Sequence, residues 1–256
     1  MKLTDKQITD NWAELQDLIS TEFTGDRKDK LLAMYSFFEE RMVIAPASGL
    51  EHYHNCFEGG YVDHVLRVIN CAKELQKSWD LMGAISSDYT TEELMFSALN
   101  HDLGKIGDRE FPYYIPNPSE WHRKNQGKIY DPNPNIQHMT VPHRSIWLLQ
   151  EYGINFSQNE MIGILTHDGV YDSANDAYLK PWGKEKALWN NLPIVLHHAD
   201  HMASRIEYER WNSGNTIKTA FSKNPKSFTK TPKISTEGAT SSQAQDMFKD
   251  LFGEGN

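Results

Sequence analysis

The stretch Leu99-Asn100-His101-Asp102-Leu103-Gly104-Lys105-Ile106-Gly107-Asp108 decides how the fold of this chain is interpreted. An imidazole and a carboxylate stand side by side at the end of an apolar segment, and a divalent cation accepts both as ligands. Adjacent helical residues point about 100° apart, so one ion can bind both only if the helix ends here, and Gly104 supplies a stop. A capping Asp beside an incidental His would look the same, so the interpretation depends on the other segments.

Length and composition predict one main domain with extensions. The chain has 256 residues, of which 39% are hydrophobic and 24% charged. A chain of this length and composition can bury a hydrophobic core that needs no stabilising cross-links. Its two cysteines, Cys56 and Cys71, form no CxxC pair, which argues against a zinc finger or a disulfide framework and predicts reduced thiols. We see no secretory signal and no apolar run of membrane-spanning length, so we expect a cytoplasmic protein with no membrane contact.

The net charge of −9 bears on the choice of partner. Sequence-independent affinity for nucleic acid comes mainly from Lys and Arg that neutralise phosphates. An acidic chain is therefore a poor candidate for an extended nucleic-acid-binding surface. A small phosphorylated substrate remains compatible, because a bound metal ion can supply positive charge locally.

Hydrophobic periodicity predicts helices along most of the chain. Residues 1–44 form two amphipathic helices, separated at Gly25, which we expect to pack on the core as an extension. Residues 45–213 are expected to form the metal-binding domain. Residues 214–256 are predicted to be a flexible tail, with a linker to about 243. The tail ends in an amphipathic segment at 245–252, which could dock on a protein partner or pack back on its own domain.

Two predicted helices lead to the central stretch. An irregular segment rich in turn residues ends at Gly59-Gly60, which allows the next helix, carrying His64, to start close to another part of the chain. By itself His64 could equally be a semi-buried histidine without a metal. Thr90 and Glu93 then have the spacing of a capping box, and the helix that they begin delivers His101 and Asp102.

The segment from 111 to 137 contains five prolines among several aromatic residues and is predicted to be a long irregular loop. It would be either a lid or specificity loop over the metal site or a disordered insertion. After it, Pro142 suits the first turn of a helix, with His143 and Arg144 beside that start. A second capping box at Ser157 begins a helix that ends at His167-Asp168-Gly169, again a His-Asp pair before a glycine.

The last strong helix begins near Pro193. Along it, His197, Asp200, His201 and Ser204 share one face at spacings of three and four residues. A buried carboxylate is costly unless it is paired or metal-bound, so we favour Asp200 as a ligand. Because the strand signal is weak throughout, the predicted fold class is all-α, with long irregular loops.

These residues together resemble the HD-domain superfamily of metal-dependent phosphohydrolases, over roughly residues 45–210. The resemblance implies a helical bundle, with the first His, the His-Asp pair and the last Asp on one metal. It further implies two His on a second metal, with the Asp of the pair bridging. The implied ligands are His64, His101, Asp102, His143, His167 and Asp200.

Within that superfamily, the pattern is most similar to the HD domain of a bacterial 3′–5′ exoribonuclease family. The similarity lies in Ala45-Pro46-Ala47, His52-Tyr53-His54, Gly59-Gly60 and Thr166-His167-Asp168-Gly169. That family has a preceding OB domain where this chain has predicted helices, and it has His-His-Gly where this chain has His-Asp-Gly.

The function expected from this ligand set is hydrolysis of a phosphoester or phosphoanhydride bond of a nucleotide by metal-activated water. Mixed N and O ligands suit Mn, Fe, Co, Ni or Zn more than Mg, in one or two ions. Lys105 and Arg144 are candidates to bind phosphate oxygens, and Asp168 is a candidate acid or base near the metals. Tyr113, Tyr114 and Trp121 could contact the base.

Three alternatives stay open. The same aromatic residues could form stacking platforms for single-stranded nucleic acid in a 3′–5′ exonuclease, with the lysine-rich tail as an electrostatic arm. Some HD-fold proteins hold a di-iron centre that activates oxygen, and this chain could be one of them. A non-enzymatic adaptor is disfavoured, because every metal-ligand position of the pattern is filled.

Overall fold

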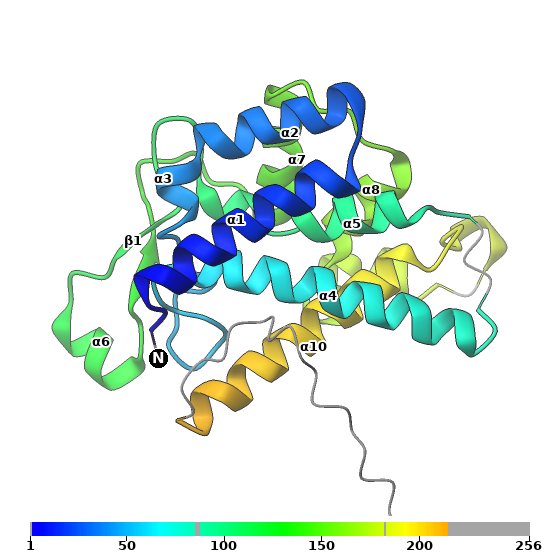
Figure 1. Cartoon of the computed structure of the whole chain (residues 1–256). Coiled ribbons are helices and arrows are strands. Elements are labelled where there is room, and N and C mark those ends of the chain that lie inside the picture. The colour runs from blue at the N-terminus through cyan, green and yellow to red at the C-terminus, as the bar shows by residue number, and fades with distance from the viewer. Residues whose placement is uncertain (1, 85–87, 182, 215–256) are drawn as a thin grey trace, which may run out of the picture. The chain divides into compact units, whose positions relative to one another are not determined.

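The computed structural model describes residues 2–84, 88–181 and 183–214. Over these ranges the chain is mostly helical, and its strands form one small two-stranded sheet, in keeping with the all-α prediction (Figure 1). In the same ranges, no helix combines the length and the apolar character that crossing a bilayer requires. The amphipathic segment predicted at 245–252 lies outside the described residues, as does the predicted linker beyond 214.

The region predicted as an N-terminal extension contains α1 (Asp5–Glu22), α2 (Gly25–Phe37) and α3 (Glu39–Met42). Thr4 caps α1 in a capping box with Gln7. The single helix predicted for the second half of this region is instead α2 followed by α3, because the backbone leaves helical angles at Phe38, at φ −95° and ψ 5°. The ring of Phe38 is buried at that bend, so packing outweighs helical continuity there.

Helix α4 (Gly60–Leu81) begins at a close backbone approach. Its N-cap, Gly59, has φ +81°, and a Cβ on Gly60 would lie 2.0 Å from the carbonyl oxygen of Asn55. Only glycine lets the loop before the helix press so tightly against its first turn. The predicted close approach at Gly59-Gly60 is confirmed.

Helix α5 (Thr91–Asn100) carries the central stretch to its end. The predicted capping box of Thr90 and Glu93 is present. His101 keeps helical angles, whereas Asp102 has φ −103° and ψ 9°, and a short 3₁₀ turn, η1 (Leu103–Ile106), follows. The helix therefore ends where a shared ion would require.

The segment from 111 to 137 is more regular than the sequence predicts. Strands β1 (Tyr114–Pro116) and β2 (Tyr130–Pro132) pair antiparallel, and α6 (Glu120–Gln126) lies between them. The expectation of a purely irregular loop is wrong here. Proline cannot donate to a strand ladder, so a hairpin that pairs each tyrosine with a proline leaves no strand pattern in the sequence.

The remaining long helices are α7 (Val141–Glu151), α8 (Gln158–Thr166) and α10 (Leu192–Asn212). Pro142 and Pro193 occupy first-turn positions of α7 and α10, and Ser157 caps α8 in a capping box, as predicted. Short turns connect α8 to α10, namely η2 (Gly169–Tyr171), η3 (Ser173–Asn175), α9 (Asp176–Leu179) and η4 (Lys184–Lys186).

Helix α4 is central to the packing. It lies along α10 and α5, α8 packs on α5, α7 and α10, and α1 covers α4 (Figure 1). Each of these helices buries an apolar stripe, which includes Leu15, Val65, Leu66, Leu99, Ile164, Val195 and Leu196. As a result, α4, α5, α8 and α10 converge, and their polar side chains meet in the region described next.

Candidate metal centre

Imidazoles and carboxylates from four helices meet in one buried cluster. His64 comes from α4, His101 and Asp102 from the end of α5, His167 from the end of α8 and Asp200 from α10. The first four are buried, and the side chain of Asp200 is 17% exposed. Their ligand atoms fall into overlapping triplets in which all atoms lie within 4.8 Å of one another. These buried His and Asp groups could hold a metal ion.

His64 lies at the centre of the cluster. Its Nε2 lies 3.2 Å from Oδ1 of Asp200 and 3.6 Å from Oδ2 of Asp102. Nε2 of His101 lies 3.4 Å from Nε2 of His64 and 3.4 Å from Oδ2 of Asp102. Four potential ligand atoms from three helices therefore converge on one small volume.

The hydrogen bonds on the far side of each ring fix which nitrogen faces the cluster. Nδ1 of His101 lies 2.8 Å from the carbonyl oxygen of Ala98, and Nδ1 of His167 lies 2.8 Å from that of Ile164. A carbonyl can only accept, so in both rings Nδ1 carries the hydrogen and Nε2 of the neutral ring has a free lone pair. This is the form of imidazole that binds a metal through Nε2.

Asp102 joins two sides of the cluster. Its Oδ2 faces His64 and His101, whereas its Oδ1 lies 3.6 Å from Nε2 of His167. Lys105 also donates to Oδ2, at 2.6 Å. Although burial opposes it, Lys105 and His101 hold the pKa of Asp102 well below its usual range, so the carboxylate is ionised. One oxygen toward each side is the arrangement that a bridging ligand requires.

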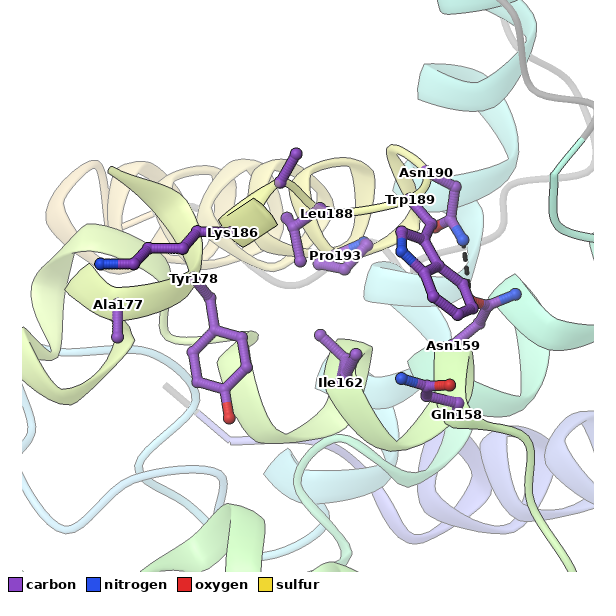
Figure 2. Close-up of a pocket in the computed structure, with 11 residues that line it drawn as sticks. Gln158, Asn159, Ile162, Ala177, Tyr178, Lys186, Leu188, Trp189, Asn190 and Pro193 are labelled. Carbon is purple, nitrogen blue, oxygen red and sulfur yellow. Dashed lines mark hydrogen bonds between the residues drawn. The ribbon is translucent and has the colours of Figure 1, made fainter. Parts of the chain in front are cut away.

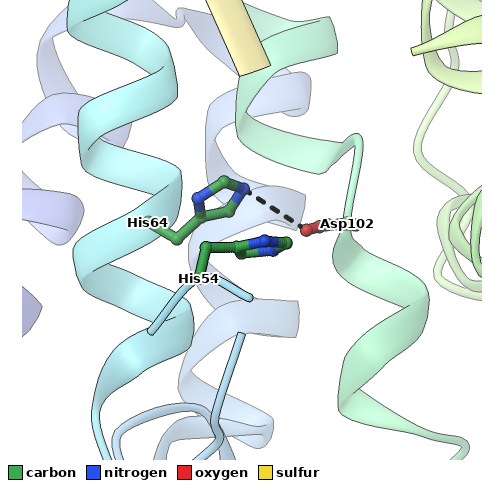
Figure 3. Close-up of side chains that lie close together, drawn as sticks. All are labelled: His54, His64 and Asp102. Carbon is green, nitrogen blue, oxygen red and sulfur yellow. Dashed lines mark ion pairs between the residues drawn. The ribbon is translucent and has the colours of Figure 1, made fainter. Parts of the chain in front are cut away.

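His54, from the loop before α4, also belongs to the cluster, although the sequence did not identify it as a ligand. Its ring lies 4.6 Å from that of His64, centroid to centroid, and it groups with His64 and Asp102 (Figure 3). Its Nε2 is buried and has no hydrogen-bond partner in the described part of the chain. Burial and His64 lower its pKa well below the usual value, so the ring is neutral. An unpaired buried nitrogen needs a partner, and a metal ion would be one.

The loop that carries His54 is fastened to α4 by one side chain. Asn55 donates to Oδ2 of Asp63 at 2.8 Å, and its own backbone is left-handed, at φ +43°. Asparagine is among the few non-glycine residues that accept this conformation readily. His54 is thereby held against His64, the residue that follows Asp63 in α4.

A second residue that the sequence analysis missed is Glu207, which lies behind His64. Its carboxylate lies 3.1 Å from Nδ1 of His64 and accepts from Nε of Arg67 at 2.9 Å. Arg67 in turn donates to Asp63 at 2.7 Å. A carboxylate behind a ligating imidazole fixes its orientation and raises its basicity. Glu207 follows Asp200 by seven residues, or two helical turns, so extending the polar face of the last helix would have found it.

The charge of this network favours a cation. The network contains four carboxylates but only two permanently charged cations. The carboxylates are those of Asp63, Asp102, Asp200 and Glu207, and the cations are Arg67 and Lys105. Burial lowers the pKa of His64, but Glu207 and Asp200 outweigh it and raise this pKa to about 10. Against the same effect of burial, Asp102 and Asp168 raise the pKa of His167 to about 9. Without metal the cluster therefore takes up protons, and a divalent cation would supply the same positive charge.

The predicted catalytic residues lie at the edge of the cluster. Lys105 is bonded to Asp102, and Oδ1 of Asp168 lies 3.8 Å from Nε2 of His167 with its side chain 48% exposed. Tyr114, on β1, lies near Lys105. Burial raises the pKa of Tyr114 to about 12, although the Lys105 ammonium acts in the opposite direction. These three groups lie where a ligand of the cluster could reach them.

Other predicted residues lie apart from the cluster. His143 is exposed, its Nδ1 lies 2.6 Å from Oγ1 of Thr140, and it belongs to none of the close ligand groups in the described ranges. A role at a second ion stays a prediction. Arg144 is buried and donates to backbone carbonyls, at 2.9 Å to that of Gln137, so its guanidinium supports the structure around α7.

The predicted aromatic contacts divide in the same way. The Arg144 guanidinium lies over the ring of Tyr113, 5.1 Å from its centroid, and Tyr113 packs edge-on against Tyr114. Trp121 is 60% exposed on α6, which Figure 1 shows at the edge of the view, away from α8. On α10, His201 is exposed and stacks on Tyr171, at 5.3 Å between centroids, so it does not face the cluster.

Neither the models of known protein families, nor the curated proteins, nor the solved structures give a match to this chain. The candidate metal centre therefore rests on its own geometry, burial and charge.

Proposed function

We propose that this chain is a metal-dependent phosphohydrolase of the HD type, which cleaves a phosphoester or phosphoanhydride bond of a nucleotide. One observation carries the proposal. Nε2 of His64 and Nε2 of His101 lie 3.4 Å apart among carboxylate oxygens, each with its Nδ1 bonded on the far side of its ring. Two neutral rings in this arrangement would point lone pairs at each other, which is unfavourable. In the metal-free chain the proton that His64 takes up relieves this repulsion, and a metal ion held between the rings would relieve it in the same way.

His64, His101, Asp102 and Asp200 would hold one ion, and His167 together with Asp102 would contribute ligands to a second one. One or two ions held there would supply Lewis acidity to a phosphate group and would lower the pKa of a coordinated water. Mixed imidazole and carboxylate ligands favour Mn, Fe, Co, Ni or Zn over Mg.

The chain's own side chains complete the site. The Lys105 ammonium, now on Asp102, can swing to a phosphate oxygen of the substrate and stabilise the charge that develops there. Asp168, half exposed beside His167, is placed to accept or donate a proton at the leaving group. Tyr114 lies beside Lys105 and offers a hydroxyl to the same phosphate, while Tyr113 and Trp121 are the predicted contacts of the base.

The test combines metal analysis of the purified protein with product release. Mn-supplemented protein is given nucleoside mono- and triphosphates, a cyclic nucleotide and short single-stranded oligonucleotides, and phosphate, pyrophosphate and nucleoside are measured. We expect hydrolysis of a free nucleotide that is lost in Asp102→Ala, because this variant removes the bridging carboxylate. Asp17→Ala, on the exposed face of α1, is the matched control and should keep full activity.

Other outcomes would replace the proposal. Shortening of oligonucleotides alone, from the 3′ end, would make the chain an exonuclease, with the exposed Trp121 as a stacking surface. Two irons per chain with oxygen consumption and no phosphate release would make it an oxygenase. A purified protein that binds none of these metals would overturn both enzymatic alternatives as well as the proposal itself.

A further inference from the structure

A cavity separate from the metal cluster lies between α8, η4 and the first turn of α10, and none of the metal-cluster residues lines it (Figure 2). Its volume is about 310 Å³. This falls at the lower end of the range for pockets that hold small organic ligands, which is about 300 to 1,000 Å³. The cavity is therefore large enough for a small organic ligand with a flat ring system.

Aromatic and apolar side chains shape the cavity. Trp189 and Tyr178 stand on opposite sides of it, with Ile162 on the floor between them (Figure 2). The Trp189 side chain is 78% exposed and that of Tyr178 is 42% exposed. An indole held so far out of the core leaves one of its faces free, and a flat aromatic ligand gains most from stacking on such a face.

The polar groups of the wall differ in whether they are already paired. The Asn190 amide donates to Oδ1 of Asn159 at 2.8 Å, and the Asn159 amide donates to Glu93 at 3.1 Å, so both are committed to the protein. Gln158, next to them, makes no side-chain hydrogen bond within the described ranges. Its amide offers one donor and one acceptor together, which matches the edge of a heterocycle that carries both.

The side of the cavity opposite Trp189 carries a positive charge. Lys186 lies on the Tyr178 side of the cavity, and its ammonium has no acidic partner among the residues that the structure describes (Figure 2). A lysine without a partner beside an apolar cavity favours a ligand with an anionic group at that end. The free amide and the free cation thus lie at opposite ends of the cavity.

We propose that this cavity binds a nucleoside monophosphate, with its base on Trp189 and Gln158 and its phosphate toward Lys186. The chemistry required is a flat heterocycle with a donor and an acceptor on one edge and an anion at the other end. This is a ligand site separate from the metal centre, and it does not depend on the proposed hydrolysis. It contacts the first turns of α8 and α10, the helices that carry His167 and Asp200 further along.

The experiment is a titration of the unmodified chain with AMP, GMP, CMP and UMP in EDTA, which suppresses metal-dependent turnover, followed by tryptophan fluorescence and calorimetry. Saturable binding of at least one nucleotide is expected, because the cavity shares no side chain with the metal cluster. Trp189→Ala should weaken it by roughly tenfold or more, and Trp189→Phe should restore part of the loss. Failure of the hydrolase proposal would leave this result unchanged.

Two further variants separate the parts of the ligand. Lys186→Ala should weaken nucleotide binding but leave binding of the uncharged nucleoside unchanged, whereas Lys184→Ala, outside the cavity, should change neither. Gln158→Ala should weaken both. The proposal is overturned if no nucleotide binds at millimolar concentration, or if binding survives in the Trp189→Ala and Lys186→Ala variants. Equal binding of benzoate, which lacks the heterocycle edge, would also overturn it.

Discussion

The carboxylate of Glu207 on α10 lies 3.1 Å from Nδ1 of His64 on α4, and Arg67 holds that carboxylate from the other side at 2.9 Å. Because the carboxylate accepts, the ring keeps its hydrogen on Nδ1 and directs Nε2 into the cluster. The strength of metal binding should therefore depend on a residue that does not touch the metal.

Glu207→Gln should lower the affinity for Mn²⁺ about 10- to 100-fold, the usual effect of removing a carboxylate behind a ligating imidazole. The amide can keep a hydrogen bond to the ring but loses the charge that Arg67 and His64 share. Calorimetric titration with Mn²⁺ measures the change. Glu209→Gln, exposed on the same helix, is the matched control and should bind as the unmodified chain does. Equal affinities in the two variants would contradict this role of Glu207.

His54→Gln tests whether the buried, unpaired Nε2 of His54 reaches a bound ion. The visible absorption of bound Co²⁺ depends on its ligands, so we expect its spectrum to change in His54→Gln and its affinity to fall. His52→Gln provides the comparison, since His52 is exposed in the same loop. Identical Co²⁺ spectra for the unmodified chain and His54→Gln would exclude His54 as a ligand.

Metal binding should strengthen as the pH rises. In the metal-free chain the pKa values of His64 and His167 are raised to about 10 and about 9, so both rings are protonated at neutral pH and their protons compete with the metal. Between about pH 6 and 9 the affinity for Mn²⁺ should increase, with proton release on binding. Calorimetry in two buffers of different ionisation enthalpy measures the released protons, and an affinity independent of pH would contradict the prediction.

The free energy of unfolding of the metal-free chain should fall as the pH rises, in contrast to the affinity for metal, because of the same two pKa values. Both are raised above the ordinary histidine value, so their stabilisation is fully present below about pH 6.5 and is lost as the pH rises through about 9 to 10. Denaturant unfolding of the metal-free chain over this range should show the decline. A free energy of unfolding that rises toward pH 10 would contradict it.

Gly104→Ala should destabilise the fold by about 1 to 3 kcal/mol, the usual cost of overpacking. A Cβ at this position would lie 2.2 Å from the carbonyl oxygen of Val141, so α7 and η1 would have to move apart. Gly25→Ala is the comparison, because Gly25 has open space around it and only its positive φ opposes a side chain. Chemical denaturation measures both variants, and a smaller loss in Gly104→Ala than in Gly25→Ala would contradict the collision.

Both cysteines are free, as predicted, and should be slow to alkylate in the folded chain. Burial raises the pKa of Cys56 to about 12 and that of Cys71 to about 11, so almost no thiolate is present at pH 8. Iodoacetamide should modify them at least roughly a hundredfold more slowly than a free thiol, because only the thiolate attacks. Intact-mass spectrometry follows the reaction, and rapid labelling of the native chain would contradict the prediction.

Features controlled by a few neighbouring residues could be predicted from the sequence. The capping boxes at Thr90 and Ser157 were correct, because their hydrogen bonds close within three residues. The helix end after His101 was predictable for the same reason, and so was the close approach at Gly60. In each case the determining contact lies close to the residue that signals it, so tertiary packing could not override it.

Features that depend on distant contacts could not be predicted. His54 lies in an irregular loop, and the bond from the neighbouring Asn55 to Asp63 of α4 helps to hold it beside the cluster. The polar face of α10 extends to Glu207, but only the packing of α10 along α4 shows that this carboxylate lies behind His64. The sequence alone did not show that His143 lies on the exposed side of α7.

The packing of α10 against α4 also has a consequence for the order of events during synthesis. Asp200 and Glu207 lie near the end of the described chain, whereas His64 and His101 leave the ribosome more than ninety residues earlier. Until α10 docks, His64 lacks both its carboxylate neighbour in the cluster and the carboxylate behind its ring. A nascent chain would therefore expose an incomplete set of ligands, and acquisition of metal would be among the last steps of folding.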